Sequence, residues 1–264
     1  MSMIDIHSHI LPLLDDGAKS MEEALEMARI AASDGIHRMV CTPHMFNGIS
    51  SNPEPSEVLD RVGALQEAIG KEGLRVMPGN EVHFSHQIIE KVRTRGVTNV
   101  NRQNYMLVEF PALNVPVGAK ELFEELLLNG VYPILVHPER NAQIQTRRSM
   151  VAEFVEQGVY VQLTAMSVTG EFGSAAKNCA ESLLRHNCVH FLATDAHRAE
   201  RRPPILSRGR DAAAAIIGAE RAGKLVYTNP LAVITGGAIE AEPPLSYGTP
   251  LPGKTSFFGR LLGR

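Results

Sequence analysis

The sequence contains little cysteine, and its cysteines do not form pairs. Cys41, Cys179 and Cys188 are the only three among 264 residues, an odd number with no paired spacing. Such a count excludes a disulfide framework and is typical of a protein in a reducing compartment. With 44% hydrophobic and 21% charged residues, the composition is that of an ordinary globular protein with a large buried core.

An excess of positive charge and long apolar runs are also missing. The formal net charge is −3 at pH 7, so no global positive field would attract nucleic acid, which weakens a nuclease interpretation. No apolar stretch reaches the length of about 18 residues that a membrane-spanning helix needs. The N-terminus lacks the charged and then apolar pattern of a signal peptide. We therefore expect a cytoplasmic protein without a nucleic-acid partner.

Short apolar segments alternate with helical patterns over most of the chain. Near-continuous apolar segments are typical of strands in a parallel sheet that is covered on both faces. We expect strands at residues 3–7, 37–42, 75–79, 105–110, 132–137, 159–164 and 189–195. We expect helices from the cap Ser20 to about 32, from the cap Ser56, near 120–128, 148–157, 174–186 and 209–222, and from the cap Asn229. The helix after Ser56 should bury a stripe of Val58, Leu59, Val62, Leu65 and Ile69.

Seven β/α units in succession predict a single α/β domain over residues 1–240. They favour a closed or nearly closed TIM-like barrel, (β/α)7, over a doubly wound sheet, and the active site of such a barrel lies at the carboxyl ends of its strands. Residues 241–264 are rich in proline and glycine, so we expect a C-terminal tail. The favoured interpretation is a disordered or barrel-docked tail; the alternative is that its basic and apolar end makes weak, salt-sensitive contact with an anionic membrane surface.

His7 and His9 stand at the end of the first apolar run. A strand sends alternate side chains to the same face, so His-x-His directs two imidazoles at one point, and imidazole is the commonest metal ligand among side chains. Further cation-binding residues follow the other predicted strands, which predicts a metal centre assembled from many strand ends. The candidate ligands are His7, His9, Asp16, His44, Glu81, Glu109, His137, Asp195 and His197.

Five imidazoles and four carboxylates are more than one metal ion binds. We expect two or three divalent ions, with Glu81 or Glu109 as a bridge. Ligation by nitrogen and oxygen without thiolate suits Mn, Fe or Zn. Because clustered divalent ions lower the pKa of a bridging water and hold a phosphoryl group between them, the predicted reaction is phosphoester hydrolysis by metal-activated hydroxide, without a covalent enzyme intermediate.

Two arginines are expected at the same carboxyl-terminal mouth of the barrel as the candidate metal ligands. Arg140 follows His137 in His-Pro-Glu-Arg, and Arg202 lies just past His197. A planar guanidinium suits bidentate recognition of phosphate oxygens, although either arginine could instead form surface ion pairs.

For several residues an ordinary structural role is the alternative to a role in the site. Asp15 and Asp16 before Gly17 could simply form a turn. Five histidines fit no ligand position and are interpreted as ordinary residues: His37, His83, His86, His186 and His190.

Two motif matches are rejected. Cys179 and Arg185 have the Cys-x5-Arg spacing of thiolate phosphatases, but the residues between them are helix formers, whereas that chemistry needs a glycine-rich phosphate loop. Residues 248–255 match the P-loop pattern, but no strand precedes them and only nine residues follow.

Together these motifs resemble a known family. Ile-Asp-Ile-His-Ser-His with Asp-Asp-Gly, then Thr-Pro-His, Gly-Asn-Glu, Val-Glu-Phe, His-Pro-Glu-Arg and Thr-Asp-Ala-His, are similar to the PHP (polymerase and histidinol phosphatase) superfamily over about residues 3–235. Residues 162–173 and Arg-Pro-Pro at 202–204 resemble its bacterial tyrosine phosphatases from capsule and exopolysaccharide operons. The resemblance implies a distorted seven-stranded barrel with a trinuclear, usually manganese-dependent site, in which all nine candidate ligands are present and Arg140 and Arg202 bind phosphate.

The resemblance also implies a phosphotyrosine protein as substrate, namely an autophosphorylated, membrane-associated bacterial tyrosine kinase that controls polysaccharide polymerisation and export. The phenol of tyrosine has a pKa near ~10, so its phenolate is a good leaving group and a strong general acid is dispensable. His44 or His197 would still be placed to protonate it if that histidine is not fully bound to metal. The rivals are a small-molecule phosphatase of the histidinol-phosphate kind and an inactive scaffold that binds the kinase. A homo-oligomer is compatible with the sequence.

Overall fold

The computed structural model describes residues 2–50, 52–70 and 73–248. All the predicted strands are present within a residue or two of their expected bounds: β1 (Met3–Ser8), β2 (Ile36–Cys41), β4 (Arg75–Pro78), β6 (Tyr105–Glu109), β7 (Tyr132–Val136), β8 (Tyr160–Thr164) and β9 (Phe191–Ala193). Two short strands that the sequence did not predict, β3 (His44–Met45) and β5 (Glu81–His83), follow β2 and β4 closely. The two short strands extend the predicted second and third strands beyond a break.

Each break has a local cause. Pro43 lies between β2 and β3 and has no N–H to donate to a ladder. Gly79 lies between β4 and β5, and a Cβ there would be 2.8 Å from Cγ1 of Val40, so the Val40 side chain occupies the space that a larger residue would need.

The strand pairing runs in a ring, and all of it is parallel. β1, β2 and β4 form one sheet in that order with β2 central, and the other runs β3-β5-β6-β7-β8-β9. On one side the chain itself joins the two sheets, because β2 of the first sheet continues into β3 of the second, and β4 continues into β5. On the other side, the N–H of His9 donates to the carbonyl of Ala196 at 2.8 Å and that of Asp195 donates to the carbonyl of His7 at 2.9 Å. The predicted TIM-like barrel is therefore confirmed, and its distortion lies in the two interrupted strands.

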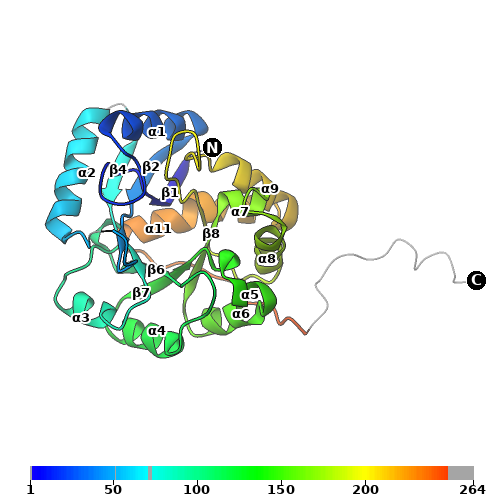
Figure 1. Ribbon diagram of the computed structural model, residues 1–264. Coiled ribbons are helices and arrows are strands. Elements are labelled where there is room, and N and C mark those ends of the chain that lie inside the picture. The colour runs from blue at the N-terminus through cyan, green and yellow to red at the C-terminus, as the bar shows by residue number, and fades with distance from the viewer. Residues whose placement is uncertain (1, 51, 71–72, 249–264) are drawn as a thin grey trace, which may run out of the picture.

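The helices lie around the strands, as Figure 1 shows, apart from α11, which that view places at the middle of the ring. They are α1 (Met21–Asp34), α2 (Pro55–Ile69), α3 (Ile88–Arg93), α4 (Ala119–Leu128), α5 (Ala142–Thr146), α6 (Ser149–Glu156), α7 (Ala165–Thr169), α8 (Ser174–Arg185), α9 (Ser207–Ile217), α10 (Ala219–Gly223) and α11 (Asn229–Thr235). Two short 3-10 turns are present: η1 (Val100–Arg102) precedes β6, and η2 (Pro138–Arg140) follows β7. A π-helical turn, η3 (Lys224–Thr228), precedes α11. Ser20 caps α1 as predicted, since its side chain accepts from the N–H of Glu23.

Four details of the predicted helices are wrong. Ser56 does not cap α2, because the helix already begins at Pro55, whose fixed φ suits a first helical position. Leu59 leaves the buried stripe and is 37% exposed. The final helix is present, but Asn229 is its first residue rather than its cap, because η3 runs directly into α11, and the Asn229 side chain instead donates to the carbonyl of His190. The predicted helix 209–222 is divided at Gly218, whose φ is +86°.

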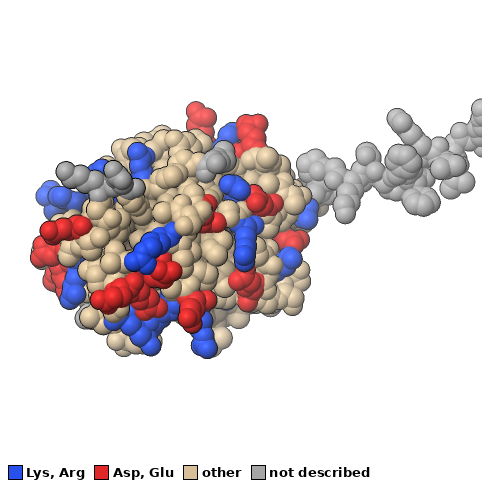
Figure 2. Space-filling model, turned by 90° about the horizontal axis from the view of Figure 1, so that it is seen from above, with Lys and Arg blue, Asp and Glu red and all other residues tan. Residues whose placement is uncertain are grey.

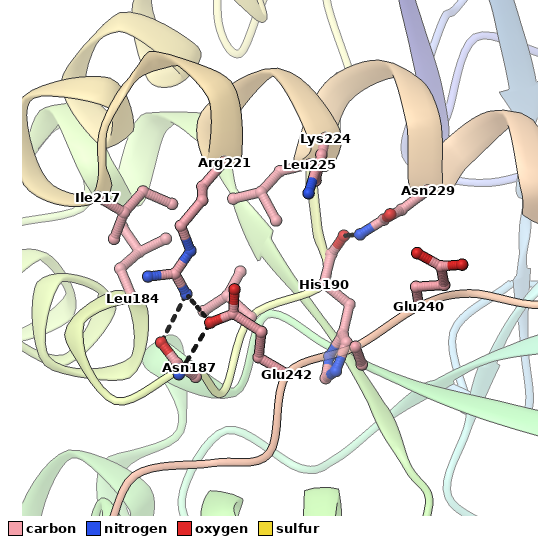
Figure 3. Close-up of a pocket in the computed structure, with 12 residues that line it drawn as sticks. Leu184, Asn187, His190, Ile217, Arg221, Lys224, Leu225, Asn229, Glu240 and Glu242 are labelled. Carbon is pink, nitrogen blue, oxygen red and sulfur yellow. Dashed lines mark hydrogen bonds and ion pairs between the residues drawn. The ribbon is translucent and has the colours of Figure 1, made fainter.

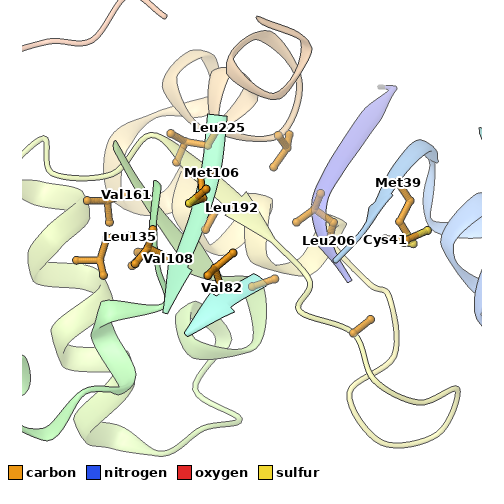
Figure 4. Packing of buried hydrophobic residues seen from close by; sticks show 14 of the residues in the cluster. Met39, Cys41, Val82, Met106, Val108, Leu135, Val161, Leu192, Leu206 and Leu225 are labelled. Carbon is orange, nitrogen blue, oxygen red and sulfur yellow. The ribbon is translucent and has the colours of Figure 1, made fainter. Parts of the chain in front are cut away.

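Apolar side chains fill both sides of the barrel wall. Outward-facing residues such as Met106, Val108 and Leu135 pack beneath the surrounding helices, and Figure 4 shows part of this cluster. Inward-facing residues such as Leu107 and Ile134 form a second cluster together with Val233 and Ile234 of α11. The barrel is thus a packed core that α11 helps to fill, and a polar site has room only at one end.

The described part of the predicted tail packs on the barrel. The Tyr247 ring stacks on His186, with the centroids 3.8 Å apart, and Glu242 forms an ion pair with Arg221 at 3.6 Å. Figure 3 shows Glu242 and Arg221 in a small pocket of about 70 Å³, where Asn187 binds both of them. The boundary at residue 241 stays a prediction. The basic and apolar end and nearly all of the rejected P-loop match lie in 249–264, outside the described residues.

Surface charge is mixed on the face seen from above. Figure 2 shows lysine and arginine interspersed with aspartate and glutamate there. No helix in the described part of the chain has the length and apolar character needed to cross a membrane.

Candidate metal centre

The candidate ligands meet at the carboxyl ends of the strands. His7 lies near the end of β1, Glu109 ends β6, and His44 and Glu81 begin the short strands beyond the breaks. All nine predicted ligands fall into overlapping groups whose ligand atoms lie within 4.8 Å of one another. The groups are His9, Asp16, His44 and His197; His7, His9 and Asp195; His7, Glu81 and His137; and His44, Glu81 and Glu109.

Glu81 lies at the middle of these groups. Its Oε1 is 2.7 Å from Nε2 of His137, and its Oε2 is 3.3 Å from Nε2 of His7 and 3.2 Å from Nε2 of His9. The side chain is fully buried. Glu109 lies farther out, at 3.8 Å from His137. Of the two predicted bridging residues, Glu81 is therefore close to more of the other ligand atoms than Glu109 is.

Asp195 divides its two oxygens between histidines and arginines. Oδ1 lies 3.5 Å from Nε2 of His7 and 3.4 Å from Nε2 of His9. Oδ2 accepts from Nη1 of Arg140 at 2.5 Å and also from Nη2 of Arg202. Both arginines are thus placed at the edge of the predicted centre, with about a quarter of each side chain exposed.

An aromatic ring lies beside the two arginines. The Phe172 ring centroid is 5.2 Å from Cζ of Arg140 and 5.5 Å from Cζ of Arg202, which are cation–π distances. Phe172 belongs to the loop between α7 and α8, at the carboxyl end of β8. The sequence contained no signal for this contact, because it joins three separate loops.

Asp16 forms the outer side of the centre. Its Oδ1 is 3.5 Å from Nε2 of His44 and 3.4 Å from Nε2 of His197, and its side chain is 62% exposed. The neighbouring Asp15 does more than the predicted turn. It accepts from the N–H of Gly17 at 2.9 Å, as a turn residue would, and also from Nδ1 of His9 at 2.7 Å.

Outer hydrogen bonds fix the orientation of three imidazoles. Nδ1 of His7 donates to Oε1 of Gln162 at 2.8 Å, and Nδ1 of His197 donates to the carbonyl of Asp195 at 2.9 Å. Nδ1 of His9 is bound to Asp15 in the same way, so the rings of His7, His9 and His197 all direct Nε2 toward the centre. Such partners orient metal-ligating histidines and make them better donors. Sequence reasoning did not assign Gln162 this role, since a buried glutamine on a strand gives no distinctive pattern.

His83 is the one ordinary histidine that touches the cluster. It was expected to have no role, but its Nδ1 contacts Oε2 of Glu109 at 3.1 Å, because it ends β5 two residues after Glu81. His186 stacks on Tyr247 and His190 accepts from the N–H of Val161, so both have structural roles away from the centre.

Three residues of the site have strained backbone conformations. His137 has a φ of +35°, Asp195 of +51° and Arg202 of +61°. Residues other than glycine rarely adopt these values, and where they do, the surrounding structure must hold them. The strain directs the side chains that follow β7 and β9 toward the mouth.

Opposite charges keep the central carboxylates ionised. Burial raises the pKa of Glu81, but His7 and His44 hold the pKa of this carboxyl well below its usual value. Burial has the same effect on Asp195, and Arg140 and His7 outweigh it and hold its pKa well below the usual value too. Ionised carboxylates are the form that ligates cations.

The donor set fits divalent cations. His44 Nδ1 and Glu81 Oε2 lie 2.9 Å apart, yet neither has a partner with hydrogen-bond geometry among the described residues. The Nε2 atoms of His7 and His9 face each other at 3.3 Å while their Nδ1 atoms are used elsewhere. Converging donors without hydrogen-bond geometry are what a set of metal ligands presents. Cysteine belongs to none of the groups found in the part of the chain that the structure describes.

The rejected cysteine motif has no catalytic geometry. Cys179 lies on α8 and is buried, and burial raises the pKa of its thiol to about 12. Thiolate chemistry needs the opposite shift.

Comparisons with known proteins agree with this geometry. The family described as "Capsular polysaccharide synthesis, CpsB/CapC" matches residues 3–235. The chain is 39% identical over 202 residues to the tyrosine-protein phosphatase YwqE of Bacillus subtilis (strain 168), covering 76% of this chain and 79% of the relative. It is 36% identical over 208 residues to the putative tyrosine-protein phosphatase CapC of Staphylococcus aureus, covering 78% and 81%.

Solved structures give the same picture. One from a study of YwqE from Bacillus subtilis and CpsB from Streptococcus pneumoniae, described as metal-dependent tyrosine phosphatases, superimposes with a TM-score of 0.88 at 35% identity, covering 92% of this chain and 98% of the other. A histidinol phosphate phosphatase from Lactococcus lactis shares only the fold, with a TM-score of 0.56 at 16% identity over 84% of this chain and 94% of the other. The chain belongs to the CpsB/CapC family of capsular polysaccharide synthesis.

Proposed function

We propose that this chain is a metal-dependent protein-tyrosine phosphatase that dephosphorylates a tyrosine kinase controlling capsule or exopolysaccharide synthesis. Curated relatives at 27–39% identity are named tyrosine-protein phosphatases, and the family acts in capsule synthesis. The observation that carries the proposal is the convergence of nine nitrogen and oxygen donors on a mouth that also holds two arginines. We place both the proposed enzyme and the phosphotyrosines of its kinase substrate in the cytoplasm.

The nine residues would hold two or three divalent ions, with manganese as our first assignment and iron or zinc as the alternatives. When bound, such ions supply a water of lowered pKa and neutralise phosphoryl charge. Glu81 would be shared between ions, because its two oxygens face different histidines. Gln162 and Asp15 would keep His7 and His9 in the tautomer that binds metal.

The two arginines would orient the phosphoryl group. Both guanidinium groups lie on Oδ2 of Asp195 and are partly exposed, so phosphoryl oxygens that enter from solvent meet them at the edge of the centre. A guanidinium offers parallel N–H donors to a tetrahedral oxyanion. His44 and His197 flank Asp16 on the outer side, and whichever of the two is not fully bound to metal is our candidate for proton transfer to the departing phenolate.

A direct comparison of substrates tests this proposal. Purified protein should hydrolyse a phosphotyrosine peptide in preference to histidinol phosphate, chelation should abolish the activity, and Mn²⁺ should restore it. Preference for histidinol phosphate would favour the small-molecule phosphatase, and absence of any hydrolysis with metal bound would favour the scaffold. Activity that survives chelation and is lost on thiol alkylation would instead support the rejected thiolate mechanism at Cys179.

A further inference from the structure

One side of the barrel mouth carries exposed apolar side chains. Leu13 is 69% exposed, Ile49 89%, Leu113 78% and Val117 95%. They lie in the loops that follow β1, β3 and β6, at the carboxyl ends of those strands. We call these four residues the apolar rim.

The loops of the apolar rim are neighbours around the ring. In the order of pairing, β1 is followed by the interrupted strands and then by β6. Asp15, in the loop after β1, accepts from the N–H of His44 at 3.1 Å, which ties that loop to β3. The N–H of Phe84 donates to the carbonyl of Glu109 at 2.8 Å, which ties the loop after β5 to the end of β6. The apolar rim therefore occupies one arc of the mouth.

This arc borders the open side of the predicted metal centre. The side chains of His7, His9 and Glu81 are fully buried, whereas those of Asp16 and Glu109 reach solvent. Asp16 follows Leu13 by three residues in its loop, and Glu109 precedes Leu113 by four. The two ligands that reach solvent therefore lie close in sequence to Leu13 and Leu113 of the apolar rim.

Leu13 is held outward against its local preferences. Its φ is +64°, a conformation that leucine rarely adopts, and its N–H donates to the carbonyl of Ala18 at 3.0 Å to close the loop. Its neighbours Leu11 and Leu14 are buried. Strained residues persist where the surrounding structure holds them and are concentrated at binding sites. The loop thus buries two leucines and presents the third to solvent.

The opposite arc of the mouth is cationic. The loops after β7 and β9 carry Arg140 and Arg202, and the loop after β8 carries Phe172 between them. A phosphotyrosine whose phosphate lies at these arginines would direct its polypeptide across the centre toward the other arc. A small alkyl phosphate has no chain to reach it.

We infer that the apolar rim binds the polypeptide that flanks the phosphotyrosine of a protein substrate, through apolar side chains within a few residues of the tyrosine. The inference rests on the proposed phosphatase function. Apolar contacts at the edge of a site raise the affinity for one class of substrate without touching the reacting atoms.

The test replaces the apolar rim and varies the substrate. The variant combines Leu13→Asn, Ile49→Ser, Leu113→Ser and Val117→Ser, with asparagine at position 13 because it tolerates positive φ. Substrates are a phosphotyrosine peptide with leucine and valine beside the tyrosine, the same peptide with serine there, and p-nitrophenyl phosphate. Leu128→Ser is the matched control, because Leu128 is 80% exposed but ends α4, at the opposite end of the barrel.

We expect kcat/KM for the leucine peptide to fall by about tenfold or more, which corresponds to about 1.4 kcal/mol, and to do so through KM. The serine peptide and p-nitrophenyl phosphate should change by less than about twofold, and Leu128→Ser should change none of them. Equal losses on all three substrates, or no loss on any, would overturn the inference. It would equally be overturned by loss of binding to anionic vesicles with unchanged peptide kinetics, which would make the apolar rim a membrane surface.

Peptide binding by fluorescence anisotropy separates the two proposals. If wild type hydrolyses none of the substrates but binds the leucine peptide more tightly than the variant does, the phosphatase proposal fails and the docking inference stands. If wild type hydrolyses phosphotyrosine and the two proteins bind the peptide equally, the docking inference fails alone.

Discussion

Arg140→Ala is the substitution that most sharply separates phosphate binding from metal binding. Arg140 belongs to none of the metal-ligand groups, and its Nη1 lies 2.5 Å from Oδ2 of Asp195. Arg202 contacts the same oxygen, so Asp195 remains paired when Arg140 is removed. The variant should therefore fold and bind metal while one of the two guanidinium groups at the mouth is lost.

The expected loss of rate follows from the burial of the site. Removing one strong electrostatic contact from a preorganised site that excludes water costs about 10²–10³ in kcat. Because Arg202 still supplies a cation on the same side, we expect the lower end, about 10². Arg140→Lys should recover little of this, because an ammonium cannot reproduce the planar fork.

The assay measures kcat and KM on a phosphotyrosine peptide together with metal content by plasma mass spectrometry. Arg147→Ala is the control, because Arg147 is 64% exposed and pairs with Glu153 on the surface. Near wild-type kinetics in Arg140→Ala would show that Arg140 is only structural. Loss of bound metal together with the rate would show that it supports the ligands rather than the phosphoryl group.

Three further predictions concern residues around the centre. Asp15→Asn weakens the partner of His9 Nδ1 and should lower metal affinity about 10–100-fold in a chelator competition, whereas unchanged affinity would contradict its supporting role. Phe172→Leu should raise KM for the phosphotyrosine peptide, because the guanidinium groups lose their aromatic partner, and Phe172→Tyr should restore it; identical kinetics in the two variants would refute this. Burial lowers the pKa of His190 from 6.5 to about 4, so the folded protein holds this imidazole neutral. Stability should therefore be lost as pH falls from 6.5 toward about 4, by about 2 kcal/mol near about pH 5, and urea titrations of His190→Gln should lack that part of the pH dependence. An unchanged pH dependence would contradict this origin.

The strands and the main ligands could be predicted because both are periodic. A buried parallel strand is a continuous apolar run, and the residues just after it lie at the carboxyl edge, so His137, directly after β7, and Asp195, two residues after β9, are marked by their positions. The breaks that separate β3 and β5 from β2 and β4 lie at Pro43, which lacks a donor, and at Gly79, which packs against the Val40 side chain, and a run of apolar residues does not reveal them.

The supporting residues could not be predicted, because their role depends on contacts between distant loops. Gln162 reaches His7 across 155 positions, and Phe172 meets arginines from two other loops. Asp15 was marked as a turn residue and is one, but its bond to His9 arises because Gly17 lets the loop fold back. A Cβ at Gly17 would lie 1.9 Å from the carbonyl oxygen of His9. A turn can be predicted from the local sequence, whereas the side chain that the turn brings near, here His9, cannot.

The central claim is that these donors hold a cluster of divalent ions on which phosphotyrosine hydrolysis depends. The most direct test is the number of metal ions per chain in the purified protein and in Glu81→Gln, measured alongside activity, because Glu81 lies at the middle of the ligand groups. We predict two or three divalent ions per wild-type chain, and fewer ions with a matching loss of activity in Glu81→Gln. A wild-type chain that hydrolyses phosphotyrosine with one ion or none, or a Glu81→Gln chain with full metal content and full activity, would contradict the account.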